Sequence, residues 1–188
     1  MGLGRSEPFK TGSLVQHAGK RGPSYVESLY NDNLISENTF SLFLSSDEKE
    51  QHIYFGEPLT KKMKKPESIH YIKLQDDLFW AASCQGFAFG PLLNDYRVPD
   101  FNSDFINNGE MYSIFDSGSN TIQMPENIFE PFLNALLLEV GQGVSDRYVD
   151  GQGVYVKCNR AYPDLHFLFD RTWLQVDPED YVKDISAE

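Results

Sequence analysis

The stretch Ile114-Phe-Asp-Ser-Gly-Ser-Asn-Thr-Ile-Gln-Met-Pro125 determines how the rest of the chain is interpreted. It places Asp116 at the end of an apolar strand and follows it with a small residue, a glycine and a hydroxyl. In such a tight turn the Gly118 amide and the Ser119 hydroxyl can donate hydrogen bonds to the carboxylate, which favours its charged form and fixes its direction. Only glycine lets the backbone approach so closely. The tripeptide Asp-Ser-Gly is also common in ordinary turns, so alone it does not identify a site.

A long amphipathic helix is predicted after this turn, over Pro125–Gly141. Apolar residues recur every three or four positions from Ile128 to Val140, and Gly141 stands where a left-handed helix cap belongs. Pro131 suits a helix only near its first turn, which favours a start later than Pro125.

Most of the remaining pattern predicts strands. An earlier helix is expected from Pro23, with that proline in its first turn. Alternating or continuous apolar runs predict strands at Thr39–Ser45, His52–Phe55, Ile69–Leu74, Leu78–Phe89, Met111–Phe115, Val154–Lys157, Leu165–Phe169 and Trp173–Val176. The strands outnumber the helices and do not alternate with them, so the sequence predicts a mostly-β protein with two connecting helices. Phe79, Trp80 and the apolar face of the second helix are assigned to the core.

Composition excludes several classes of function. The 188 residues carry 16 Lys+Arg against 28 Asp+Glu, a net charge of −12. This sign argues against nucleic acid as a partner. No apolar run has the length of a membrane span. The histidines show no ligand spacing, so no metal site is expected, and Cys84 and Cys158 form no metal-binding motif.

Ordered matches along the chain resemble the pepsin-like aspartic peptidases, chiefly the second half of their two-lobed chain. Asp116-Ser-Gly-Ser119 resembles the second D-[ST]-G-[ST] active-site motif of that family, and Ile122–Pro125 with the following helix resembles its continuation. Four further segments resemble parts of the family's two lobes: Met1–Gly4 and Ser24–Leu44 from the end of the first lobe, and Tyr162–Phe169 and Val176–Val182 from the second.

The resemblance implies a fold and a division into domains. It implies a β-barrel peptidase lobe with two short connecting helices, in an incomplete bilobal fold. Residues 1–60 would be the end of the N-terminal lobe and the interlobe strand, and residues 61–188 would be a partial C-terminal lobe. The first-lobe motif and the flap would then lie upstream of Met1. Cys158 resembles the late disulfide cysteine of the family, and Cys84 is expected to be a buried thiol.

The resemblance also implies an activity. An aspartic-type endopeptidase cleaves peptides with a water activated between two aspartates, and this chain would supply the second-lobe aspartate, Asp116, only. Ser117, Gly118 and Ser119 would support that residue. The expected partner is a peptide or protein substrate, acted on by a monomer without metal or cofactor. The expected location is secretory, vacuolar or lysosomal.

Two other functions are compatible with parts of the sequence. A catalytically inactive, peptidase-like remnant that binds a peptide or protein would explain the single D-[ST]-G motif. A symmetric dimer of the retroviral type would need an apolar-apolar-Gly segment after the motif. Nothing between Thr121 and Glu188 matches such a segment, so the dimer is disfavoured.

Overall fold

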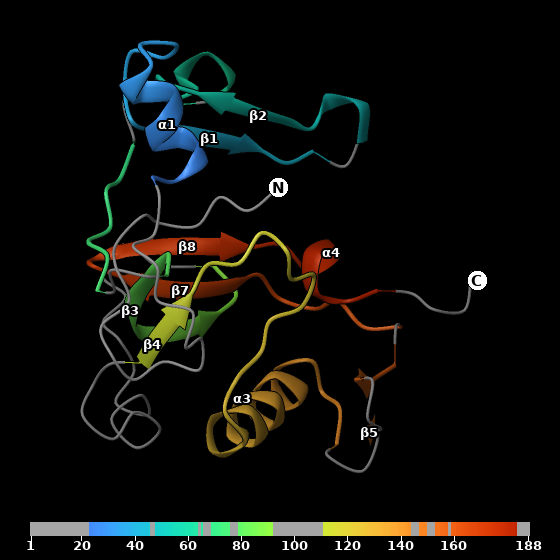
Figure 1. Cartoon of the computed structure of the whole chain (residues 1–188). Helices are drawn as coiled ribbons and strands as arrows, with labels where there is room; N and C mark the ends of the chain where they lie inside the picture. Colours follow the sequence, from blue (N-terminus) through green and yellow to red (C-terminus); the bar gives the residue numbers. More distant parts are fainter. Residues whose placement is uncertain are drawn as a thin grey trace. The chain divides into compact units, whose positions relative to one another are not determined.

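The computed structural model describes residues 23–45, 48–63, 65, 69–75, 79–91, 111–143, 147–149, 153–157 and 159–183. The chain divides into two compact units, Met1–Ala81 and Ala82–Glu188, called here the N-terminal and the C-terminal unit. Strand residues outnumber helical ones in the described part of the chain (Figure 1), so the mostly-β prediction is confirmed. The described strands form open sheets rather than a closed barrel.

The N-terminal unit begins with helix α1, Tyr25–Asn31. The Ser24 hydroxyl caps it by accepting a hydrogen bond of 3.2 Å from the Glu27 amide. Serine is a favoured residue at this position because its side chain satisfies an amide that has no partner within the helix. The predicted place of Pro23 inside the first turn is therefore wrong, since the helix starts after Ser24.

The rest of this unit is built on an antiparallel hairpin. Strands β1 (Phe40–Phe43) and β2 (His52–Phe55) pair so that Phe40 faces Phe55 and Leu42 faces Ile53. Both predicted strands are confirmed at these residues. The ring of Tyr25 packs against Phe55, with ring centres 5.6 Å apart, and joins α1 to the hairpin. Two single-turn 3-10 helices, Glu48–Glu50 and Thr60–Lys62, complete the unit's regular structure in the described residues.

One predicted strand of the N-terminal unit does not form. Residues 69–75 carry no strand, and the backbone hydrogen bond found there is a contact of 2.9 Å from the Gln75 amide to the Ala81 carbonyl. The alternating apolar residues of Ile69–Leu74 suit a strand, but in the described residues they have no neighbouring strand to complete a ladder. The prediction is wrong because a pattern of alternation does not supply a pairing partner.

The C-terminal unit is built on a four-stranded sheet with the order β4-β3-β7-β8. Its strands are β3 (Ala81–Phe89), β4 (Met111–Ile114), β7 (Leu165–Phe169) and β8 (Thr172–Val176). Strands β3, β7 and β8 pair antiparallel, and β4 lies at one edge. The predicted strands in these four regions are confirmed.

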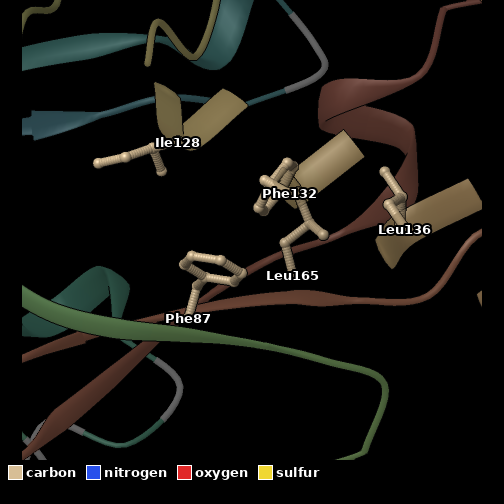
Figure 2. Close-up of a cluster of buried hydrophobic side chains, with 5 residues drawn as sticks. All are labelled: Phe87, Ile128, Phe132, Leu136 and Leu165. Atoms are coloured by element: carbon tan, nitrogen blue, oxygen red, sulfur yellow. The ribbon is translucent and has the colours of Figure 1, made fainter. Parts of the chain in front are cut away.

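Helix α3, Glu126–Glu139, packs on the sheet and makes the core of the C-terminal unit. Figure 2 shows its inward residues Ile128, Phe132 and Leu136 facing side chains from β3 and β7. The Phe132 ring meets Phe87 edge-on, with ring centres 5.0 Å apart. An edge-to-face pair of this kind stabilises the fold by about 0.5–1.5 kcal/mol, in addition to the free energy gained by burying its apolar surface.

The two ends of α3 differ from each other. At the C-terminal end the prediction is confirmed: Gly141 has φ 67°, its amide bonds the Leu138 carbonyl, and the Gln142 amide bonds the Leu137 carbonyl. This pair of bonds is a Schellman cap. At the N-terminal end the helix starts at Glu126, one residue later than Pro125 as expected, but Pro131 lies inside the helix and beyond its first turn. The carbonyl that loses its partner belongs to Asn127, an exposed residue, where water can replace the missing amide.

Three smaller elements complete the C-terminal unit. Helix α4, Pro178–Tyr181, brings the α-helices of the described residues to three, where the sequence predicted two. Strands β5 (Tyr148–Val149) and β6 (Val154–Tyr155) form a short hairpin. Arg147, just before β5, bonds Glu130 of α3 at 2.6 Å and ties this hairpin to the helix.

Candidate active site

The site predicted from the sequence lies at the end of the edge strand β4. The strand ends at Ile114, Phe115 follows, and Asp116 opens a turn that continues through Ser117 and Gly118. After the turn, the chain runs into α3, whose N-cap is Pro125. The apolar strand and the amphipathic helix on either side therefore deliver the four predicted site residues to one exposed turn.

Two amide hydrogen bonds hold this turn. The Gly118 amide donates to Oδ1 of Asp116 at 2.9 Å, and the Ser119 amide donates to the Asp116 carbonyl at 3.1 Å. The bond to the carboxylate oxygen is the one that the sequence predicted from Gly118. It fixes the rotation of the Asp116 side chain, because a charged acceptor binds an amide more strongly than a neutral one.

The predicted contact from the Ser119 hydroxyl is wrong. That hydroxyl donates instead to the Thr121 carbonyl at 3.3 Å, in the direction of the helix. Ser119 therefore supports the exit of the turn and not the carboxylate. A hydroxyl has one hydrogen to donate, so it cannot make this bond and the predicted one at once.

A neighbouring side chain, and not the backbone conformation, explains why glycine suits position 118. The φ of Gly118 lies outside the left-handed region, which other residues avoid. A Cβ atom at this position would lie 3.2 Å from Oδ1 of Asp116. Glycine therefore leaves the space that the carboxylate occupies.

The carboxylate is accessible. Asp116, Ser117, Gly118 and Ser119 are all exposed, and the neighbouring Ile114 and Phe115 are 51% and 44% exposed. An aspartate with one oxygen held by an amide and its side chain open to solvent can accept a proton from water or donate one to a carbonyl. The arrangement can therefore serve acid–base chemistry.

A ring contact joins the turn to the sheet. Phe115 packs against Phe169 at the end of β7, with ring centres 5.1 Å apart and planes at 51°. Phe169 is buried, at 5% exposure. Sequence reasoning missed this pair, because the two residues are far apart in the chain and neither has a chemical signature.

The sequence also singled out two aromatic residues and the histidines. Phe79 and Trp80 are 48% and 36% exposed, so their assignment to the core is wrong. They precede β3, and Trp80 meets Phe40 edge-on at 5.4 Å in the N-terminal unit. His166 is buried within β7, and the described residues hold no cluster of side chains suited to a metal ion.

The described cysteine is a structural thiol. Cys84 is 1% exposed on β3, as predicted, and its thiol donates to the Gly86 carbonyl at 3.4 Å. Burial raises the pKa of this thiol, and hydrogen bonds with the backbone of Gly86 and Leu168 oppose that shift. A thiol kept in its neutral form is a poor nucleophile. Cys158 lies outside the described residues.

Comparisons with known proteins identify the family of the chain. A family model described as eukaryotic aspartyl protease matches residues 1–188. The chain is 27% identical over 143 residues to Plasmepsin VI of Plasmodium berghei (strain Anka), a match that covers 74% of this chain and 29% of that relative. In the described residues every helix is too short or too polar to cross a bilayer. The family model covers the whole sequence, and the chain belongs to the eukaryotic aspartyl protease family.

Proposed function

We propose that this protein is an aspartic-type endopeptidase and that Asp116 is the second-lobe aspartate of its active site. Ser117, Gly118 and Ser119 form the turn that carries it. One observation supports this assignment most: an exposed carboxylate at the end of a strand, with one oxygen held by the Gly118 amide at 2.9 Å.

The chemistry needs a second aspartate close to Asp116. Two carboxyl groups that share one proton cannot both ionise, so one is a base while the other is an acid. The base takes a proton from a bound water, the water oxygen attacks the peptide carbonyl, and the protonated carboxyl polarises that carbonyl. The chain holds a single D-[ST]-G motif, so we assign the partner aspartate to the first lobe of a longer protein.

The same proposal covers the domains, partners and location. Residues 1–60 would belong to the end of the first lobe and residues 61–188 to the second. The chain spans 29% of the length of the relative that it matches, which leaves room in such a protein for a first lobe. The substrate would be a peptide or protein, the enzyme would be a monomer, and the net charge of −12 disfavours nucleic acid. By family resemblance the protein would work in a secretory, vacuolar or lysosomal compartment.

The test is removal of the Asp116 charge in the full-length protein that carries this chain. Asp116→Asn should abolish peptide hydrolysis at acidic pH, and a statine-type transition-state analogue should inhibit the unchanged protein. Asp32→Asn is the matched control, because it makes the same substitution at an exposed residue that follows α1 and has φ −82°. Normal hydrolysis by Asp116→Asn would refute the assignment.

A second candidate function is a peptidase-like protein that binds a peptide without cleaving it. The exposed turn and the single motif favour it for the 188-residue chain alone. A sensitive hydrolysis assay on this chain should then be silent, while a fluorescent peptide still binds. Hydrolysis by the full-length protein that disappears with Asp116→Asn would exclude the binder.

A further inference from the structure

The hydrogen bonds of the active-site turn are local and do not fix its place on the C-terminal unit. The amides of Gly118 and Ser119 bond Asp116 itself, so they set the shape of the turn. Strand β4 ends two residues before Asp116, at the edge of the sheet, and contributes only four residues to it. A short edge strand has one neighbour to hold it, so a further contact is needed to keep Asp116 in position.

The ring of Phe115 supplies that contact, and its partner Phe169 stands at an irregular point of the sheet. Opposite Phe169, the pairing of β3 with β7 shifts between Cys84 and Gly86, which is a β-bulge. A bulge bends its strand and redirects side chains, and bulges are frequent next to active sites. The irregularity thus lies beside Phe169, the residue of β7 whose ring contacts Phe115.

A second irregularity follows Phe169 directly. The hairpin from β7 to β8 pairs Phe169 with Thr172, and the two residues between them, Asp170 and Arg171, have φ 43° and 69°. Two left-handed positions suit a tight hairpin turn, and aspartate is common at the first of them, but the second normally holds glycine and here holds Arg171. An unfavourable backbone conformation persists only where its surroundings require it, and strain of this kind gathers at functional sites.

We propose that Phe169 is a positioning residue for Asp116, which it acts on through the ring of Phe115. The inference rests on the proposed function of Asp116. The bulge in β3 lies opposite Phe169, and the tight turn of Asp170 and Arg171 follows Phe169 directly. Phe115 lies on that ring, and Asp116 is the next residue in the chain, so the position of the carboxylate follows the position of the ring pair.

A spectroscopic experiment on the 188-residue chain tests the positioning without any need for hydrolysis. The heteronuclear Overhauser effect of the Gly118 amide falls in amplitude when a backbone segment moves freely, so it measures how firmly the turn is held on the C-terminal unit. Phe169→Leu keeps an apolar side chain in the buried site but removes the ring. We expect the Overhauser amplitude at Gly118 to fall at least twofold.

Two further variants separate positioning from simple loss of stability. Phe115→Leu changes the half-exposed partner and should give the same fall in amplitude, and the double variant should fall no further than either single one. Phe167→Leu is the matched control. The Phe167 ring lies on the same strand as Phe169 but packs against the buried core residues drawn in Figure 2. This variant should lower stability and leave the Gly118 amplitude unchanged.

The results have distinct meanings. An unchanged amplitude in Phe169→Leu and Phe115→Leu, or an equal fall in Phe167→Leu, overturns the positioning role. If Phe169→Leu does not fold, Phe115→Leu still decides the question. In the full-length protein, the positioning role predicts that Phe115→Leu lowers kcat about tenfold with KM within about twofold, because small displacements of a reacting group slow chemistry more than binding. If the unsubstituted full-length protein does not hydrolyse peptides, the proposed function is contradicted. The amplitude measured on the 188-residue chain would still decide the positioning role.

Discussion

Substitution of Gly118 by alanine tests whether the turn that carries Asp116 depends on the space beside the carboxylate. The added Cβ would lie 3.2 Å from Oδ1 of Asp116 and 4.0 Å from its Cγ. Because the φ of Gly118 lies outside the left-handed region, alanine can adopt the backbone conformation without strain. The perturbation therefore acts on the position of one carboxylate oxygen.

The magnitude follows from this contact. A carbon–oxygen distance of 3.2 Å is shorter than ordinary packing, so Oδ1 must move by a few tenths of an ångström away from the amide that holds it at 2.9 Å. A hydrogen bond to a charged group contributes about 1.5–3 kcal/mol where it is buried, and less at this exposed turn, so we expect less than about 1 kcal/mol of lost stability. A displacement of about 1 Å can slow catalysis by about 100-fold, so a shift of a few tenths should lower kcat about fivefold to tenfold.

The assay combines peptide hydrolysis by the full-length protein with urea unfolding of the 188-residue chain. Gly153→Ala is the control, because a Cβ there would meet nothing within 4 Å and the φ of Gly153 is also outside the left-handed region. The control should keep its kcat and its stability. Full kcat in Gly118→Ala, with the fold intact, would refute the reasoning.

Three further predictions concern the C-terminal unit, and each is tested by urea unfolding. Leu137 is 0% exposed on α3 and its neighbour Leu138 is 70% exposed. Leu137→Ala should therefore lower the unfolding free energy by about 3–5 kcal/mol, and Leu138→Ala by less than about 0.5 kcal/mol. Similar losses for the two variants would contradict the assigned helix face. Arg171→Gly should raise the unfolding free energy by about 0.5–1 kcal/mol because it relieves φ 69°, and a decrease would argue against strain in this turn. Tyr181 donates a hydrogen bond of 2.6 Å to the Pro163 carbonyl, and its pKa is raised, first by burial and then by Tyr162 and Asp164. The stability that this phenol gives is fully present below the ordinary tyrosine pKa of about 10 and is lost as the pH rises above it. Tyr181→Phe should therefore cost about 1 kcal/mol at neutral pH and weaken the alkaline decline, while an unchanged decline would contradict the role of Tyr181.

Much of the fold could be predicted because its signals are local. The spacing of apolar residues marks α3, and Gly141 marks its end through a backbone conformation that glycine tolerates best. The start of the same helix was less predictable. Pro131 has no amide to donate to the Asn127 carbonyl, but Asn127 is exposed and water can take the place of that amide, so the helix tolerates the proline. The strand expected at Ile69–Leu74 failed because alternation describes one chain while a strand needs a partner.

The contacts of the candidate site also divide into local ones, which the sequence predicts, and long-range ones, which it does not. The bond from Gly118 to Asp116 spans two residues, so the motif itself predicts it. A hydroxyl at position 119 can donate to a carboxylate or to a backbone carbonyl, and the sequence alone could not choose between these two acceptors. The contact of Phe115 with Phe169 depends on the pairing of β7 in the sheet, which no short motif encodes.

The hairpin of the N-terminal unit bears on the solubility of the protein. A two-stranded hairpin is marginally stable by itself. Its paired residues Leu42 and Ile53 are 38% and 44% exposed, and Leu44 just after β1 is 72% exposed. At neutral pH the net charge of −12 keeps copies of the chain apart by electrostatic repulsion. Acid removes carboxylate charge and leaves the apolar residues unchanged, so self-association through this hairpin should increase under the acidic conditions in which aspartic peptidase activity would be assayed.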